Sequence, residues 1–215
     1  MTSGIKILYF NIFQLLILIS SIFLIFHISI DYLYFTNDVV FAPYLDVYSK
    51  TRITNLIELR DKWYWVSYLI FPILFAIKCF FVSLIIYLGT YLMDENFDYL
   101  EVFKISVVSQ TVFVFPEIIK LIWFSFNHIS LDALREFSPL SLFSLFDPEL
   151  LQEWLYYPLK VLNLFEVGNW VLLAYLLAKH LNQAFDAMLK LVLTYYVSFL
   201  FCWIIFVMFI SLGNS

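Results

Sequence analysis

The first candidates for chemistry in this 215-residue chain are four of the charged residues inside its apolar stretches: Lys78, Glu117, Lys120 and Glu166. Lys78 lies at the middle of a run from Trp65 to Met93, where burying an unpaired ammonium costs about 2.5 to 3.5 kcal/mol on insertion scales. Glu117 and Lys120 lie in a third run, and Glu166 lies in a fourth. Because ionisable groups inside membrane helices pair with one another, we expect these four side chains to form an intramembrane charge network.

The pairing within this network follows from helical spacing. Glu117 and Lys120 are three residues apart, so they share a helix face and can pair with each other, beside a kink expected at Pro116. That assignment leaves Glu166 as the partner of Lys78.

The fourth run also carries a semi-polar face. Asn163, Glu166 and Trp170 recur at helical spacing, with Asn169 beside them. We expect this face to point at other protein rather than at lipid.

The charge network has two interpretations. It can form a polar pathway, which would make the protein a small transporter or channel component that uses Lys78, Glu117 and Glu166. Alternatively, it consists of buried ion pairs that fix helix packing or bind another subunit. Transporters commonly contain internal repeats or spans broken by Gly and Pro. The chain has four glycines and no matching pair of broken runs, which favours the second interpretation.

No residue pattern predicts catalysis, a cofactor or a metal site. The histidines His27, His128 and His180 belong to different segments, and the chain has no His-Glu-x-x-His motif, Gly-rich phosphate loop or nucleophile elbow. Cys79 and Cys202 lie in apolar runs without metal-ligand spacing, so we expect them to pack as small hydrophobes. The protein is therefore predicted not to be an enzyme.

Five long apolar runs must position these residues. Hydrophobic residues make up 63% of the chain, charged ones 13%, and the mean hydropathy is +0.90. A hydrocarbon core of about 30 Å requires about 20 helical residues per crossing. The predicted fold is an all-α polytopic membrane bundle, one membrane domain over residues 1–215, with five transmembrane helices near 7–33, 65–93, 102–126, 159–178 and 188–212. The first and fifth have no charged residue at their centres, so we expect them to be lipid-facing boundary helices.

Two long connections alternate with two short ones, so one face carries nearly all of the mass outside the membrane. In the first long connection, Ile53, Leu56 and Ile57 recur at helical spacing and predict an amphipathic helix that leads into Trp63 and Trp65. Such a helix either lies in the membrane interface or docks a partner.

A second amphipathic helix is expected in the other long connection. Asp147 can cap a helix that starts at Pro148, and Trp154 and Leu155 fall on its apolar stripe before Pro158 ends it. We expect the same two roles for this helix, membrane contact or partner docking.

Two segments resemble a known family. The stretch FDYLEVFKISVVSQTVFVFP (Phe97 to Pro116) resembles the second loop and third span of the five-span Yip1-like membrane proteins, and LNLFEVGNWVLLA (Leu162 to Ala174) resembles their fourth span. The resemblance implies a helical bundle with a cytoplasmic N-terminus, and a role in organising or trafficking membrane proteins rather than catalysis.

The Lys and Arg counts of the loops favour the opposite orientation by a single residue. We adopt the orientation implied by the resemblance, in the plasma (inner) membrane if the source is bacterial. The predicted function is a non-catalytic accessory or scaffold subunit of a larger membrane complex, in protein transport or membrane trafficking. Its predicted partners are membrane lipids and other integral membrane subunits, and no nucleic acid.

Overall fold

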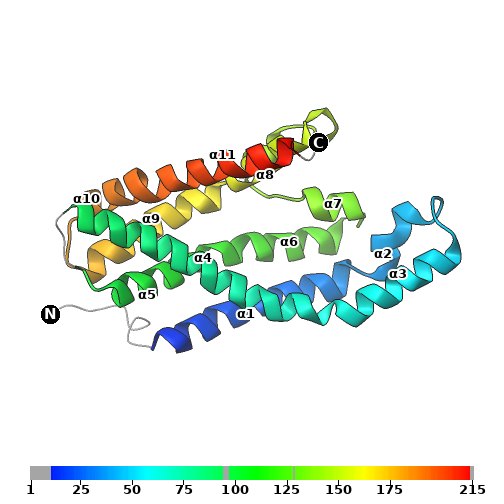
Figure 1. Cartoon of the computed structure of the whole chain (residues 1–215), viewed down its shortest axis with the longest axis horizontal. Helices are drawn as coiled ribbons and strands as arrows, with labels where there is room; N and C mark the ends of the chain where they lie inside the picture. Colours follow the sequence, from blue (N-terminus) through cyan, green and yellow to red (C-terminus); the bar gives the residue numbers. More distant parts are fainter. Residues whose placement is uncertain (1–10, 94–96, 128, 214–215) are drawn as a thin grey trace.

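The computed structural model describes residues 11–93, 97–127 and 129–213, and every helix or strand assigned in them is a helix. The helices form an elongated bundle (Figure 1). Within the described residues, four helical stretches are long and apolar enough to cross a membrane: Ile12–Tyr34, Trp65–Leu92, Tyr99–Phe126 and Phe185–Leu212. The all-α prediction is confirmed for this part of the chain, and its four long apolar helices suggest a multi-pass membrane protein.

The elements follow one another in a simple order. They are α1 (Ile12–Tyr34), α2 (Asn37–Phe41), η2 (Ala42–Tyr44), α3 (Lys50–Trp63), α4 (Trp65–Leu92), α5 (Tyr99–Ser109), η3 (Gln110–Phe113), α6 (Val114–Phe126), α7 (Leu131–Glu136), η4 (Leu142–Leu145), η5 (Pro148–Leu150), α8 (Glu153–Val161), α9 (Leu164–His180), α10 (Phe185–Leu191), the π-helical segment η6 (Val192–Val197) and α11 (Ser198–Leu212).

Polar caps mark where several helices begin. Asn11 and Gln14 form a capping box at the start of α1, in which each side chain bonds the other's backbone. The Ser49 side chain accepts from the backbone N–H of Arg52 at the start of α3, and Asn163 caps α9 in the same way. These caps supply acceptors that the first turn of a helix otherwise lacks.

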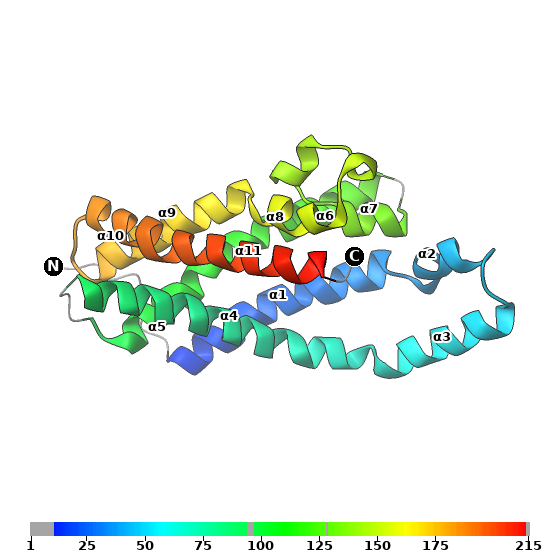
Figure 2. The ribbon, with the colours of Figure 1, turned by 45° about the horizontal axis from the view of Figure 1, so that its top comes forward.

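The long helices run back and forth along the bundle (Figures 1 and 2). α1 ends and α4 begins at one end, α4 ends and α5 begins at the other, and α6 returns the chain to the first end. α9 then runs back beside α11, which completes the path. The two long connections, 35–64 and 127–163, therefore lie at the same end of the bundle, and the short ones lie at the opposite end.

The third apolar run is a continuous helical stretch that changes helix type close to Pro116. The chain tightens in the 3-10 turn η3, before Pro116, and α6 starts at Val114. Pro116 then lies in the first turn of α6, where its missing N–H costs no hydrogen bond within that helix. The change of helix type thus lies just before the residue at which the kink was predicted.

The fourth apolar run is the least well predicted. The expected span at 159–178 is divided between α8 and α9 by a break at Leu162 and Asn163. Pro158 lies inside α8 instead of ending it, and the helix predicted to start at Pro148 consists of the turn η5 followed by α8. α9 has 17 residues and is not among the four candidate spans.

The core combines all five apolar runs. Its buried residues include Leu15 and Ile19 of α1, Cys79 and Ile86 of α4, Val102 and Ile105 of α5, Leu173 and Leu177 of α9, and Met188, Leu191 and Val192 of α10 and η6. The first and fifth runs are therefore part of the packed core as well as of the outer surface. A smaller cluster of Ile30, Tyr34, Phe124 and Leu134 joins α1, α6 and α7 at the end with the long connections.

Candidate functional site

The candidate site is a cavity of about 670 Å³ between α4, α8, α9 and α11. Its polar groups include Lys78, Lys160, Glu166 and Tyr196, and most of the remaining wall is aliphatic or aromatic. The structure thus places Lys78 and Glu166, two residues of the predicted charge network, in the lining of one cavity. This volume lies within the range of about 300 to 1,000 Å³ that is typical of small-molecule sites. We call it the Lys78 cavity.

Glu166 is positioned by the break between α8 and α9. Asn163 donates to the carbonyls of Lys160 and Val161, and its Oδ1 accepts from the backbone N–H of Glu166 at 2.8 Å. One side chain therefore ties the end of α8 to the first turn of α9. This fixes the direction in which Glu166 leaves the helix.

The Glu166 carboxyl is buried and already hydrogen-bonded. Its Oε1 accepts from the Tyr196 hydroxyl at 2.7 Å and from Trp170 Nε1 at 3.0 Å. Trp170 follows Glu166 by one helical turn, and Tyr196 comes from η6, so two helices hold one acidic group. Sequence reasoning placed Trp170 beside Glu166 but missed Tyr196.

Lys78 has a different environment. Its Nζ lies 4.1 Å from the centre of the Phe113 ring, an arrangement that stabilises a cation through the negative face of the aromatic ring. Among the described residues, no carboxylate oxygen lies within 4.0 Å of this ammonium, and no hydrogen bond from it is formed. Lys78 and Glu166 therefore share the cavity without a direct ion pair.

One wall of the cavity comes from α8 and α11. Trp203 Nε1 donates to the Tyr157 hydroxyl at 2.8 Å, which joins these two helices. Lys160 Nζ donates to the Arg135 carbonyl at 2.8 Å and lies over the Phe143 ring, so its charge is directed toward α7 and η4. Desolvation lowers the pKa of Lys160.

The other half of the predicted network lies elsewhere. Glu117 and Lys120 line a separate cavity of about 460 Å³, together with Asp31, Arg60 and Arg135. No ion pair within 4.0 Å joins Glu117 and Lys120 in the described part of the chain. The four charges of the predicted network therefore divide between two cavities.

Asp31 is the residue of this second cavity that sequence reasoning overlooked. It is buried near the end of α1, and its Oδ2 lies 3.4 Å from His27 Nε2. Nearby, Arg60 donates to the Phe35 carbonyl and to Asn37 Oδ1. Burial raises the pKa of Tyr64, at the junction of α3 and α4, to about 12.

Two buried side-chain amides carry an oxygen without a hydrogen-bond partner in the described part of the chain. Asn169 on α9 and Gln110 in η3 are fully buried, and within the described residues neither oxygen has a hydrogen-bond partner. Asn169 belongs to the semi-polar face predicted for the fourth run, and this face lies inside the protein. Buried unsatisfied amides are rare because each costs free energy.

The predicted docking residues of the first long connection divide between two faces of α3. Ile53 is buried and Ile57 is half-buried, on the side from which Arg60 reaches the end of α1 and the start of α2. Leu56 lies on another face together with Leu59 and Trp63, at positions i, i+3 and i+7. These three side chains are exposed, and we call them the Leu56 face.

In the second long connection, Trp154 and Leu155 are half-buried in α8, which packs against η4 and α11. They therefore contribute to packing within the chain. Apart from Tyr157 of α8, the exposed apolar residues of this connection precede α8 and were not predicted as docking residues: Leu140, Leu142, Leu145, Phe146 and Leu150.

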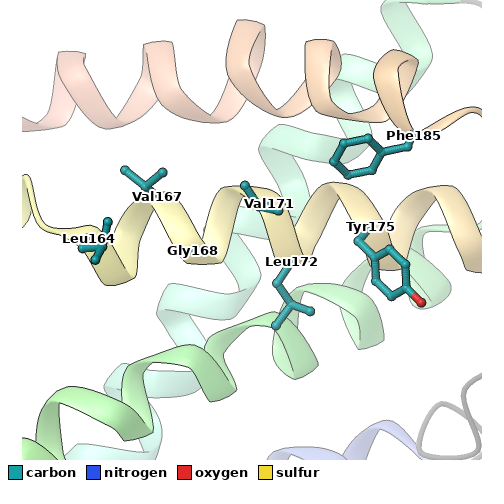
Figure 3. A pocket seen from close by; sticks show the side chains of 7 residues that line it. All are labelled: Leu164, Val167, Gly168, Val171, Leu172, Tyr175 and Phe185. Carbon is teal, nitrogen blue, oxygen red and sulfur yellow. The ribbon is translucent and has the colours of Figure 1, made fainter.

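An apolar groove of about 650 Å³ follows one face of α9. Figure 3 shows its side chains along α9, with Phe185 at the start of α10 near one end. The lining residues are Leu164, Val167, Gly168, Val171, Leu172, Tyr175 and Phe185. The outer face of α9 is thus apolar over most of its length.

Within the described residues, no three His, Cys, Asp or Glu side chains are grouped so that they could hold a metal ion. The cavity instead offers one ammonium without an oxygen partner, one hydrogen-bonded carboxyl and apolar walls, which suits binding of an amphipathic molecule. Comparison of the chain with models of protein families, with curated proteins and with solved structures gave no match.

Proposed function

We propose that the protein is a non-catalytic accessory or scaffold subunit of a membrane complex, with a role in protein transport or membrane trafficking. The main supporting observation is the extension formed by α2 and α3, which reaches beyond the ends of α6 and α11 in both views (Figures 1 and 2). α3 continues from α4 away from the bundle, and Leu59 and Trp63 on it are 55% and 56% exposed.

The Leu56 face has the pattern of a helix-docking surface. Apolar side chains at i, i+3 and i+7 are the anchors by which one amphipathic helix packs against another. Polar and charged residues flank them, including Asn55, Glu58 and Lys62. We propose that the partner is a helix of another integral membrane subunit.

The path of the chain supports five crossings. α6 ends at the end of the bundle with the long connections and α10 starts at the opposite end, so α9 must carry the chain back (Figure 1). Its 17 residues span about 25 Å, at the lower limit for a crossing helix. Its apolar outer face is what a lipid-facing helix requires.

Five crossings with alternating long and short connections are also the arrangement that the Yip1-like resemblance implies. On this proposal the short connections and the N-terminus lie in the cytoplasm, and the long connections lie on the other side of the membrane. The amphipathic helices α3 and α8 lie on that side.

The transport alternative has less support. It would use Lys78, Glu117 and Glu166 along one pathway, but Glu117 lines a different cavity from the other two. Glu117 and Lys78 also lie on different helices without an ion pair between them. The placement of Glu117 therefore favours the accessory function.

Native mass spectrometry of the protein extracted in a mild detergent tests the scaffold proposal. We expect a complex of defined mass that contains a second integral membrane protein. The double variant Leu56→Ser/Leu59→Ser should release this protein while the free chain remains folded. The matched control is Thr54→Ser/Asp61→Ser on the opposite face of α3, which should retain it. A strictly monomeric wild-type protein would contradict the proposal.

A further inference from the structure

We propose that the Lys78 cavity binds a single-chain aliphatic acid taken from the bilayer, with its acidic head group at Lys78. This inference does not depend on the scaffold function. It rests on the unequal hydrogen bonding of Lys78 and Glu166, on the composition of the cavity walls and on where the cavity opens.

The Lys78 ammonium calls for a hydrogen-bond acceptor. Glu166 Oε1 already accepts two hydrogen bonds, from Tyr196 and Trp170. The Lys78 ammonium can donate three, and the described residues offer it the Phe113 ring but no oxygen acceptor. A ligand with an anionic head group would supply that acceptor and the opposite charge at the middle of a membrane-spanning helix.

The apolar walls fit a hydrocarbon tail. Leu74, Ile77 and Phe81 of α4 face the cavity together with Phe199 and Leu200 of α11. Leu74, Ile77, Phe81 and Phe199 are also exposed on the surface of the bundle. Because these helices are candidate spans, their exposed apolar sides face lipid, and the cavity is open to the bilayer between them. An amphiphile can therefore enter sideways.

The size of the cavity favours one chain. About 670 Å³ is in the range of sites that enclose a drug-sized molecule. A phospholipid with two chains would have to leave a large part of its apolar surface outside. We therefore assign the site to a single-chain acid and not to an anionic phospholipid.

Palmitate is a suitable probe, and hexadecanol is its uncharged counterpart. Binding to the purified full-length protein in detergent is measured by native mass spectrometry. We expect palmitate to bind about tenfold or more tightly than hexadecanol, because the head group gains a charged hydrogen bond. Lys78→Met should remove this preference and leave hexadecanol binding unchanged, which also shows that the variant is folded. Lys120→Met is the matched control, since Lys120 lies in another candidate span and lines another cavity.

Glu166→Gln separates this proposal from a site for cations. Removing the neighbouring negative charge should leave palmitate bound at least as tightly, whereas a cation site would lose affinity. Equal binding of palmitate and hexadecanol by the wild-type protein would overturn the proposal without any variant. Tighter binding of hexadecyltrimethylammonium would overturn it too. Displacement of palmitate by an equal concentration of dioleoylphosphatidylglycerol would overturn the assignment to a single-chain acid.

Discussion

Glu166 illustrates how a single buried acid is held in an apolar bundle. Asn163 caps the helix that carries it, and Tyr196 and Trp170 donate to the same carboxyl oxygen. A buried polar group without partners costs roughly 1 to 3 kcal/mol, so each donor matters for stability. The three supporting residues come from the α8–α9 break, from α9 and from η6, and Glu166 therefore links parts of the chain that are distant in sequence.

The variant Tyr196→Phe tests this role. It removes the donor at 2.7 Å from Glu166 Oε1 and keeps the ring in the core. We expect the free energy of unfolding to fall by about 1 to 3 kcal/mol. The measurement is unfolding of the purified protein in mixed micelles by increasing dodecyl sulfate.

The neighbouring Tyr195→Phe is the control. Its hydroxyl forms no hydrogen bond among the described residues, so its loss should change stability much less. Equal stability of Tyr196→Phe and the wild type would mean that the Glu166 carboxyl does not need this donor.

At the scale of helices, α4 and η6 meet at a glycine. A Cβ built on Gly89 would lie 2.6 Å from Cδ2 of the Tyr195 ring, closer than real Cβ contacts allow. The π-helical turn of η6 places Tyr195 against α4 and Tyr196 toward Glu166. Small residues permit such close approach between membrane helices.

Gly89→Ala therefore carries two opposing effects. Alanine gains about 1 kcal/mol of helix propensity over glycine, whereas overpacking costs about 1 to 3 kcal/mol. We expect a net loss of stability of about 1 kcal/mol in the same dodecyl sulfate assay. In a Tyr195→Ala background the clash is absent, so the same Gly89→Ala change should become stabilising. If its sign does not reverse, the contact between α4 and η6 is not what requires the glycine.

The helices were predictable wherever the apolar run was uninterrupted. The second run, expected at 65–93, coincides with α4 at Trp65–Leu92 because nothing in it competes with the helix apart from one proline and one lysine. The fourth run was misplaced because Pro158 and Asn163 lie close together, and hydrophobicity does not show which of them separates two helices. The structure shows that Asn163 does, by capping α9.

The candidate site was only partly predictable, for a related reason. Lys78 and Glu166 are visible in sequence because a charge within an apolar run is rare. Tyr196 and Phe113 are not, since the chain has 15 tyrosines and 25 phenylalanines and spacing does not distinguish these two. Their roles arise from tertiary packing, which brings η3 and η6 beside α4 and α9.

The arrangement of the whole molecule makes the number of crossings testable. If α9 crosses the membrane, the connections 35–64 and 127–163 lie on one side and the connection between α9 and α10 lies on the other. If α9 does not cross, the residues before and after it lie on the same side. The two arrangements differ only in whether α9, a helix of 17 residues with an apolar outer face, crosses the membrane.

Single cysteines labelled by a membrane-impermeant maleimide distinguish these two arrangements. Cys202 is exposed and should first be changed to serine, whereas Cys79 is buried and can remain. We expect Lys50→Cys and Asp147→Cys to react from one side of the membrane and Ala184→Cys from the other. In the orientation that we propose, the first two react from outside intact cells and Ala184→Cys reacts only after permeabilisation, because α9 places it in the cytoplasm. Reaction of Asp147→Cys and Ala184→Cys from the same side would rule out α9 as a crossing helix, and reaction of Lys50→Cys only from the cytoplasm would reverse the orientation.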